Sequence, residues 1–308
     1  MRFNLPVLVY QEKNCVHNHA DEIAQMGKNA LIVTGRNSSK KNGSLDDVIN
    51  ALKSKNIKYT VYDGVEENPS VETVMEAREI GVKAGCDFII GIGGGSPMDA
   101  AKAIGVMIYH KNENKDFLYK SVSNSQSLPV IEVPTTCGTG SEVTTVAVLT
   151  VHNEKTKKSM SHRIFPRMAL VDEKYIKNAP LKVICDTAID ALAHIVESCI
   201  NNNATEYSKM FAKEGLEAWS KFKDVLLGNR EATDEDFHNM MYASTLAGMC
   251  IAHAGTSLPH GLSYPITYEL GIPHGKAVGY FLPGYINEAT DEDKEFVLKA
   301  AGFESVEE

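Results

Sequence analysis

Short apolar runs alternate with segments of helical periodicity along the first half of the chain, and this alternation limits the fold more than any other feature. The runs are short, and glycine or proline ends several of them, as is typical of buried strands. The expected strands are 30–34, 58–62, 87–92 and 130–133, and the expected helices are 45–53, 71–84 and 98–109. Strands separated by helices of about 10–15 residues indicate right-handed βαβ units and a parallel sheet.

The second half of the chain has the pattern of helices alone. Its long periodic segments are 183–200, 208–227 and 234–253, and no convincing strand lies among them. The character of the sequence changes between Pro166 and Pro180. We therefore expect an α/β domain over residues 1–180 and an all-α domain over residues 181–308, a division that suits domains of about 100–200 residues.

Composition excludes several classes of protein. The 31 basic and 40 acidic side chains give a net charge of −9, which argues against a nucleic-acid partner. No apolar run approaches the roughly 18 residues of a membrane span, and the N-terminus lacks a signal-peptide core. The six cysteines form no C-x-x-C pair, so no disulfide framework or thiolate zinc site is indicated. We expect a cytoplasmic protein without a nucleic-acid or membrane partner.

Three consecutive glycines connect an expected strand to an expected helix in the segment 91–99, GIGGGSPMD. Glycines let a ligand approach the backbone, and the N–H groups at a helix start favour an anion, so a pyrophosphate fits here. The G-x-G-x-x-G fingerprint is incomplete, because its sixth position is Ser96. Ser96, Pro97 and Asp99 also suit an ordinary capping box. Three glycines exceed what a cap needs, so we favour phosphate binding.

A second loop rich in hydroxyl groups, PTTCGTGSE at 134–142, follows the strand 130–133. It is either a hydroxyl-rich turn or a set of hydrogen-bond donors for a ligand. Both loops follow parallel strands, so we expect one nucleotide crevice between them.

Asp190 and His194 lie four residues apart on one face of an expected helix. His260 and His274 follow in a stretch punctuated by glycine and proline. Three imidazoles and one carboxylate suit divalent iron or zinc, with a position left for substrate. Spacing alone leaves other candidate ligands open, namely Asp186, His253, His17 and His19.

Together these segments resemble the iron-containing (group III) alcohol dehydrogenase family. The matching motifs are GGGSPMD at 93–99, PTT at 134–136, GSE at 140–142, DALAH at 190–194, and His260-Gly261 fourteen residues before His274-Gly275. The stretch 35–43, GRNSSKKNG, looks most like the 1,3-propanediol or butanol dehydrogenase branch. The resemblance implies a Rossmann-like dinucleotide domain, a helical metal-binding domain as in dehydroquinate-synthase-like proteins, and a cleft between them.

The resemblance also implies the site residues. The implied metal ligands are Asp190, His194, His260 and His274, holding Fe(II) or zinc. The implied contacts to the cofactor are Gly94, Gly95, Ser96 and Asp99 at the pyrophosphate and its ribose, Thr135, Thr136, Thr139 and Ser141 along the nucleotide, and Lys158 near the nicotinamide ribose. A homodimer is implied as well.

The loop after the first expected strand indicates which nucleotide binds. NAD enzymes commonly carry an acidic side chain there to hold the ribose hydroxyls, but this chain has Gly35. The residues that follow offer two hydroxyls and two cations, which suit a 2′-phosphate: Arg36, Ser38, Ser39 and Lys40. A solvated basic loop is the alternative. We expect NADP(H), with NAD(H) as the second choice.

Two features depart from the family pattern. Many relatives carry histidine four residues after the third ligand, whereas this chain has Tyr264, a candidate proton relay. The candidate catalytic residues are therefore Tyr264 and His274, which is also an implied metal ligand. A phenol of pKa near 10 is a poor general base. Relatives also continue for some tens of residues beyond the segment ending at Ala301, so we expect the helical domain to be truncated at its C-terminus.

These observations favour a metal-dependent alcohol dehydrogenase or aldehyde reductase that uses NADP(H) and short-chain substrates. A zinc-dependent glycerol-dehydrogenase-like enzyme is one alternative, but its family uses ligand patterns other than Asp190-x-x-x-His194. A catalytically inactive nucleotide-binding protein is another; Tyr264 and the early end support it, and the four ligands count against it.

Overall fold

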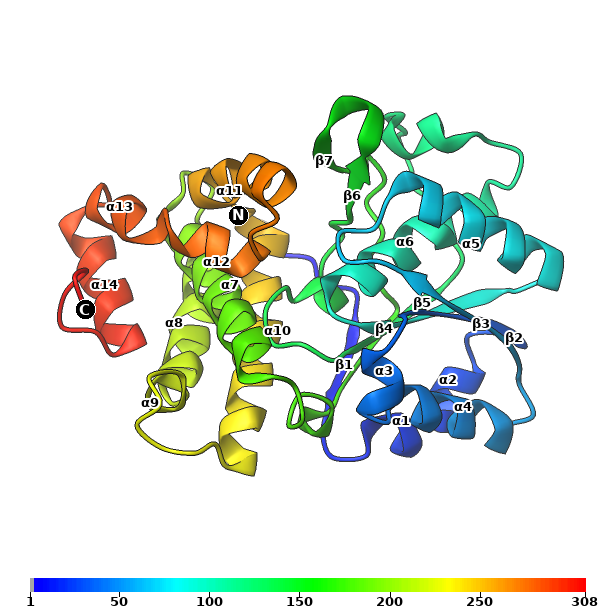
Figure 1. Cartoon of the computed structure of the whole chain (residues 1–308), viewed down its shortest axis with the longest axis horizontal. Helices are drawn as coiled ribbons and strands as arrows, with labels where there is room; N and C mark the ends of the chain where they lie inside the picture. The colour runs from blue at the N-terminus through cyan, green and yellow to red at the C-terminus, as the bar shows by residue number, and fades with distance from the viewer. Residues whose placement is uncertain (1–2) are drawn as a thin grey trace. The chain divides into compact units, whose positions relative to one another are not determined.

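In the computed structural model, which describes residues 3–308, the chain divides into two compact units (Figure 1). An α/β unit comprises residues 6–135 and 141–178. A helical unit comprises 179–308 together with two short segments, 136–140 and the described residues before Pro6. The middle of the second hydroxyl-rich loop therefore belongs to the helical unit.

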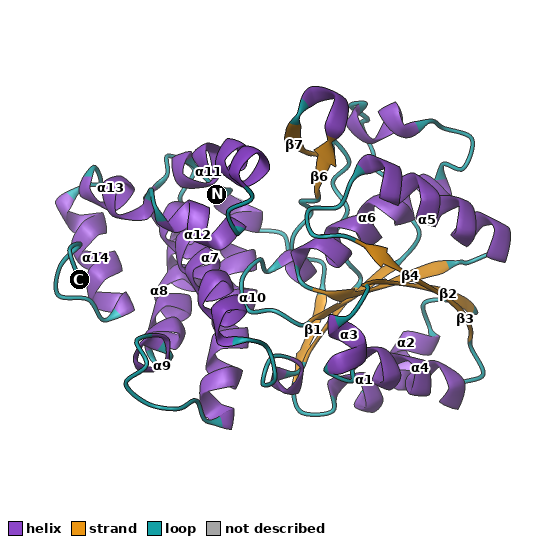
Figure 2. Cartoon of the chain, viewed as in Figure 1, coloured by secondary structure: helices purple, strands orange, loops and turns teal. Residues whose placement is uncertain are grey.

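A parallel sheet forms the centre of the α/β unit, as expected from the sequence (Figure 2). Its strand order is β1-β8-β5-β4-β2-β3. The strands are β1 (Leu8–Gln11), β2 (Asn29–Gly35), β3 (Lys58–Val65), β4 (Phe88–Gly93), β5 (Val130–Pro134) and β8 (Met168–Val171). A separate antiparallel hairpin pairs β6 (Val148–Val151) with β7 (Thr156–Ser159). Strand β8 was not expected, although its four residues, MALV, form a short apolar run like those of the other buried strands.

Helices cover both faces of the sheet. On one face lie α1 (Cys15–Asn18), α2 (Ala20–Ala24), α3 (Ser38–Lys41) and α4 (Ser44–Ser54), and on the other lie α5 (Val71–Ala84) and α6 (Gly95–Tyr109) (Figure 1). Phe88 and Ile90 pack on the first face, and Ile89 packs on the second. Because β4 is buried on both faces, its sequence is an unbroken apolar run.

The winding of the sheet reverses between the neighbouring strands β2 and β4. The chain leaves β2 for β3 on one side and leaves β4 for β5 on the other. Ligands of open α/β sheets bind at the carboxyl ends of the strands at such a switch point. The carboxyl ends of these two strands are joined there by Thr34 of β2, whose Oγ1 donates a hydrogen bond to the carbonyl of Ile92 of β4 at 2.9 Å.

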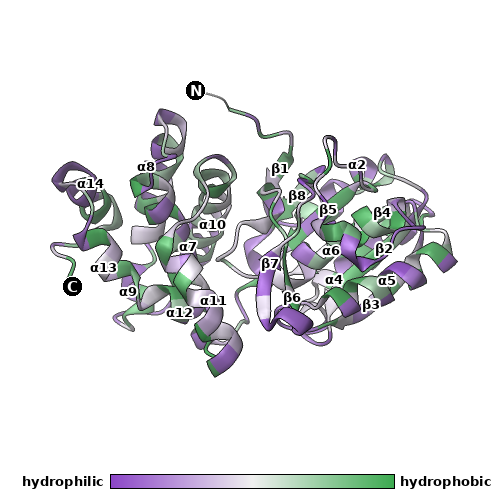
Figure 3. Cartoon of the chain, turned by 90° about the horizontal axis from the view of Figure 1, so that it is seen from above, coloured by the Kyte–Doolittle hydropathy of each residue, from purple (hydrophilic) through white to green (hydrophobic). Residues whose placement is uncertain are grey.

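The helical unit contains helices α7 to α14. They are α7 (Leu181–Ile200), α8 (Glu206–Ser220), α9 (Lys223–Leu226), α10 (Asp234–Ala254), α11 (Leu258–Leu270), α12 (His274–Gly279), α13 (Leu282–Asn287) and α14 (Asp291–Ala301). Thr205 and Thr233 begin α8 and α10 with capping boxes. Helix α8 carries both hydrophobic and hydrophilic residues (Figure 3), and its buried residues include Ala212, Leu216 and Trp219, which recur at helical spacing on one face. Within residues 3–308, no helix has both the length and the apolar character needed to cross a membrane.

Two local predictions were wrong. The expected helix 208–227 is two helices, because the chain turns to bury Phe222, whose N–H donates to the carbonyl of Trp219 at 2.9 Å. The stretch 36–43, expected to be a loop, contains the short helix α3. The capping box at Ser96, which was the alternative to phosphate binding, does not form: α6 begins at Gly95, and the Ser96 hydroxyl accepts a hydrogen bond from the N–H of Asn68 at 3.0 Å.

Glu132 on β5 is a carboxyl group enclosed in the α/β unit. It is fully buried, and neither of its carboxyl oxygens has a hydrogen-bond partner. A side chain at Gly91, the residue opposite it on β4, would overlap this carboxyl group. Burial raises the pKa of Glu132 well above its usual value, although the charge of Lys102 acts in the opposite direction. The folded chain therefore prefers the neutral acid.

We expect the stability of the Glu132→Gln variant, relative to the unsubstituted chain, to improve as the pH rises. Above the ordinary glutamate pKa of about 4.3, the unfolded chain ionises while the folded chain keeps its proton, so the unsubstituted chain loses stability with rising pH. An amide does not titrate. The midpoint of thermal unfolding at about pH 5 and about pH 8 measures the difference. The exposed Glu67→Gln variant is the control, and a constant gap between Glu132→Gln and the unsubstituted chain would contradict the expectation.

Candidate metal centre and nucleotide loops

Helix α7 places three functional side chains on one face of its buried half. Asp190, His194 and Glu197 follow at spacings of four and three residues, so they share that face. All three are buried in the helical unit. Buried polar groups nearly always have hydrogen-bond or ion-pair partners. The partners of Asp190, His194 and Glu197 therefore indicate the role of each side chain.

Asp190, His260 and His274 bring their ligand atoms within 4.8 Å of one another. Nε2 of His260 lies 3.3 Å from Oδ1 of Asp190, and Nε2 of His274 lies 3.8 Å from the same oxygen. Metal–ligand bonds of about 2.1 Å place neighbouring ligand atoms about 3–3.5 Å apart. The trio therefore has nearly the spacing of a coordination site. In the described part of the chain, it is the one such group of three or more histidine, cysteine and acidic residues.

His194 lies beside this trio. Its ring stacks on the ring of His260, with 4.3 Å between centroids, and its Nδ1 is 3.2 Å from the carbonyl oxygen of Gly138. When Nδ1 donates to that carbonyl, Nε2 keeps the lone pair that a metal would bind. Burial lowers the pKa of His194, which favours the same neutral imidazole.

Two buried atoms of the cluster face each other without a hydrogen bond: Oδ1 of Asp190 and Nε2 of His260. Burial by itself raises the pKa of Asp190, but the neighbouring imidazoles, His194 first, hold it below its usual range. Burial lowers the pKa of His260, and the carboxylates of Asp190 and Glu197 outweigh burial and raise it to about 9. An ionised carboxylate beside converging imidazoles fits a divalent cation such as iron or zinc.

Glu197 is a site residue that the sequence analysis missed. It is fully buried, and its two carboxylate oxygens accept hydrogen bonds from Nδ1 of His260 and from the N–H of Ser257. A carboxylate behind an imidazole orients the ring and makes its other nitrogen a better ligand. The signal was present in the sequence, because Glu197 follows His194 by three residues on the same helix face.

His274 opens α12, and the next residue explains how α12 packs on α7. A side chain at Gly275 would overlap the carbonyl oxygen of Asp186. Oγ of Ser263 lies 3.4 Å from Nδ1 of His274, and the ring of Tyr264 stacks 5.8 Å from the His274 ring. Tyr264 therefore lies beside the cluster, and its role as a proton relay stays a prediction.

The alternative ligands lie elsewhere. His253 stacks on Phe3, and its Nε2 accepts a hydrogen bond from the N–H of Asn4 at 3.3 Å. His19 stacks on Tyr10 and pairs with two glutamates of the α/β unit. The trio of converging ligand atoms therefore includes none of the alternative candidates, which are Asp186, His253, His17 and His19.

The three-glycine turn ends β4 and begins α6. Gly93 has a φ of 149°, where glycine is favoured, and a Cβ there would lie 2.6 Å from Cγ of Pro97. Gly94 is the N-cap residue, and no side chain caps the helix. The first N–H groups of α6 therefore suit a phosphate group, and Gly94, Gly95, Ser96 and Asp99 are all partly exposed around them.

A buried polar network joins α6 to the second loop. Oγ of Ser141 donates to Oδ1 of Asp99 at 2.6 Å, and Oδ2 of Asp99 accepts from the N–H of Val148 at 2.8 Å. Lys102, which the sequence analysis missed, is fully buried and donates to Oγ of Ser141 and to the carbonyl of Val146, both at 2.6 Å. Asp99 and Ser141 thus hold the fold together in addition to any ligand contact.

The remaining nucleotide candidates are placed as follows. The N–H of Thr135 donates to the carbonyl of Gly93 at 2.8 Å, which joins the two loops. Thr136 and Thr139 lie in the short segment 136–140, which belongs to the helical unit. Lys158 lies on β7, where its Nζ is 3.0 Å from a carboxylate oxygen of Glu154 and 5.0 Å from the centre of the Tyr119 ring.

In the loop after β2, the candidates differ in exposure. Arg36, Ser38 and Lys40 are exposed, and Gly35 is half-buried. Ser39 is fully buried, and its Oγ lies within hydrogen-bond distance of Oγ1 of Thr34, at 2.7 Å. Ser39 therefore packs α3 against the sheet.

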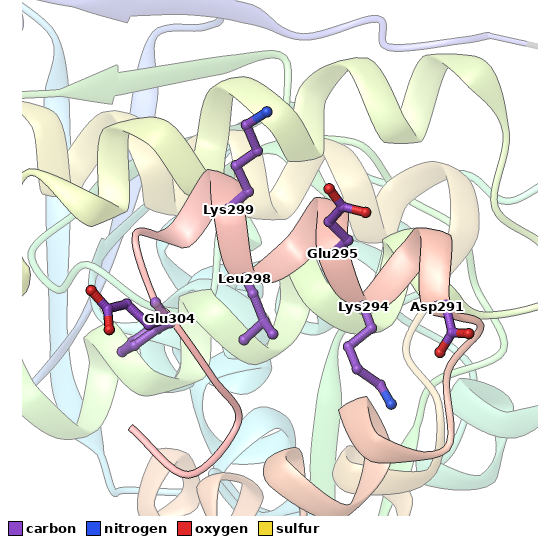
Figure 4. A pocket seen from close by; sticks show the side chains of 7 residues that line it. Asp291, Lys294, Glu295, Leu298, Lys299 and Glu304 are labelled. Carbon is purple, nitrogen blue, oxygen red and sulfur yellow. The ribbon is translucent and has the colours of Figure 1, made fainter.

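A surface hollow over α14 has a different character (Figure 4). Its lining mixes acidic, basic and apolar side chains of Asp291, Lys294, Glu295, Leu298, Lys299, Phe303 and Glu304. Lys299 and Glu295 extend to one side of α14 and Lys294 to the opposite side, so the hollow lacks the converging donors of the Asp190 cluster (Figure 4).

Comparison with known proteins decides the family. The sequence model described as "Iron-containing alcohol dehydrogenase" matches residues 6–173, and the model of the C-terminal part of the same family matches residues 184–302. The chain belongs to the iron-containing alcohol dehydrogenase family.

Individual members of this family show the same likeness. The chain is 32% identical over 261 residues to the long-chain primary alcohol dehydrogenase of Thermoanaerobacter ethanolicus, covering 84% of this chain and 65% of that protein. It is 32% identical over 290 residues to the NADPH-dependent butanol dehydrogenase of Clostridium saccharobutylicum, covering 92% and 72%. The crystal structure of an iron-containing alcohol dehydrogenase from Thermotoga maritima is 39% identical, with a TM-score of 0.92, covering 99% of this chain and 84% of that one. The chain thus spans 65–72% of the length of these two curated relatives.

For this member of the family, we expect Glu197→Gln to weaken divalent-metal binding about 10–100-fold. An amide has one acceptor oxygen, so it cannot accept both the His260 and the Ser257 hydrogen bonds that Glu197 accepts. Competition with a chelator for Zn(II), and for Fe(II) under anaerobic conditions, measures the affinity. The exposed Glu206→Gln variant on α8 is the control. Equal affinity in a folded Glu197→Gln variant, verified by circular dichroism, would refute the role.

Proposed function

We propose that this chain is a metal-dependent alcohol dehydrogenase or aldehyde reductase that transfers hydride between NADP(H) and a short-chain alcohol or aldehyde. The observation that carries the proposal is the pair of buried, facing atoms without hydrogen bonds, Asp190 Oδ1 and His260 Nε2, in a member of this family. The relative named NADPH-dependent butanol dehydrogenase supports the cofactor and the substrate class.

The proposed metal ligands are Asp190, His194, His260 and His274, and the proposed ion is Fe(II), with zinc as the alternative. A bound ion supplies Lewis-acid chemistry toward an alcohol or carbonyl oxygen. The protein's part is to present the ligand atoms. Glu197 accepts from Nδ1 of His260, and the Gly138 carbonyl lies within hydrogen-bond distance of Nδ1 of His194, so both Nε2 atoms are left for the metal.

Reduction of an aldehyde also needs a proton at the substrate oxygen. Tyr264, stacked on His274, is the proposed donor of a hydrogen bond to that oxygen. An ordinary phenol, of pKa near 10, holds its proton at neutral pH. We therefore assign Tyr264 to positioning and proton donation during reduction rather than to general-base catalysis.

The proposed nucleotide site lies at the switch point of the sheet. The N-terminus of α6, with Gly94, Gly95 and Ser96, would hold the pyrophosphate. Arg36, Ser38 and Lys40 are exposed beside Gly35 and would hold the 2′-phosphate of NADP(H). The further proposed contacts are Ser39, from the composition of the loop after β2, and, from the resemblance, Asp99, Thr135, Thr136, Thr139, Ser141 and Lys158.

We propose that the protein is cytoplasmic and forms a homodimer. All six cysteines are free thiols, which suits the reducing cytoplasm. Strand β1 lies at one edge of the sheet, with its first residue, Leu8, 53% exposed. An edge strand offers unpaired backbone groups to a second copy, so we propose a homodimer.

We expect NADPH oxidation with butanal to require added Fe(II) or Zn(II) and to be lost in the Asp190→Ala variant. Removal of a direct ligand should cost more than the roughly 10–100-fold typical of a residue behind a ligand. Anaerobic absorbance assays of NADPH measure the rate. Asp186→Ala, one turn earlier on α7, is the matched control and should keep its activity. Equal rates for the Asp190→Ala variant and the unsubstituted chain would contradict the proposal, and so would the absence of turnover with both NADPH and NADH.

A further inference from the structure

Strand β3 carries a bulge at its carboxyl end, beside the loop after β2. Val33 pairs with Tyr62 and Gly35 pairs with Val65, so Asp63 and Gly64 stand opposite the single residue Thr34. A bulge of this kind bends the strand and can redirect a side chain. A Cβ at position 64 would lie 2.8 Å from the Tyr62 ring, so a side chain there would require that ring to shift.

The bulge brings Asp63 to the cations of the loop after β2. Its Oδ2 forms an ion pair with Nζ of Lys40 on α3, and the two side chains are 50% and 49% exposed. The Lys40 hydrogen bond, with a smaller contribution from the Arg36 charge, lowers the pKa of Asp63. The carboxylate is therefore ionised at neutral pH, next to the cations proposed for the 2′-phosphate.

We propose that Asp63 is a specificity-determining residue that limits the preference of this chain for NADP(H) over NAD(H). This inference rests on the proposed function, because it takes the nucleotide to bind at the switch point. The loop that ends β2 has Gly35 at the position where NAD enzymes commonly have a carboxylate. The bulge supplies a carboxylate from the neighbouring strand instead.

The two nucleotides meet Asp63 differently. A 2′-phosphate carries about −1.5 to −2 charges at pH 7, so it must displace the carboxylate from Lys40 and is repelled by it. A ribose 2′-hydroxyl is neutral and can donate a hydrogen bond to the same carboxylate. Asp63 thus weakens the binding of NADP(H) and supports the binding of NAD(H).

Equilibrium binding of NADP+ and NAD+ to the Asp63→Asn variant, measured by calorimetry, tests this role without any need for turnover. An exposed ion pair contributes modestly, so we expect NADP+ to bind roughly three- to tenfold more tightly in the variant. NAD+ should bind equally or more weakly. Asp46→Asn, an isosteric change at an exposed position of α4, is the control and should change neither affinity.

A double-mutant cycle with Lys40→Met separates displacement from general charge effects. If Asp63 acts by pairing with Lys40, the gain from Asp63→Asn should shrink when Lys40 is absent. Unchanged or weaker NADP+ binding in a folded Asp63→Asn variant would overturn the role of Asp63 and leave the proposed function intact. Failure of the unsubstituted chain to bind either nucleotide would overturn both proposals.

Discussion

The closely spaced pair of Asp190 and His260 is the contact on which the helical unit depends. A buried carboxylate such as Asp190 must be compensated, because its desolvation costs several kcal/mol. Helices α7, α11 and α12 supply the compensation by bringing His194, His260 and His274 around it. Gly275 lets α12 approach α7 closely enough for this to happen. The packing of three helices and the chemistry of the site are thus one arrangement.

A parallel sheet imposes an equally physical constraint on the other unit. Because both faces of the sheet are covered, its loops can be exposed only at the strand ends, and the reversal of winding between β2 and β4 separates the loops that follow them. The three-glycine turn and the basic loop after β2 both lie at this point. Lys102 connects α6 to the residues after the second loop, because its ammonium group donates hydrogen bonds to Oγ of Ser141 and to the carbonyl of Val146.

The sequence was most informative where a local pattern determines the structure. The apolar runs of β2 and β4, the helical periodicity of α5, and the spacing of Asp190 and His194 all depend on nearby residues, and the fold class followed from them. Contacts between distant segments carry no such signal. The pairing of Lys102 with Ser141 and the bulge that brings Asp63 to Lys40 arise only when strands and helices pack. The buried turn at Phe222 likewise divides a pattern that reads as one helix.

X-ray absorption at the iron K edge of the anaerobically Fe(II)-loaded chain tests the central claim most directly. The account predicts a first shell of nitrogen and oxygen at about 2.0–2.2 Å, with multiple scattering from three imidazoles and one carboxylate. Sulfur ligation, or a shell without imidazole scattering, would contradict the assignment of the metal to Asp190, His194, His260 and His274.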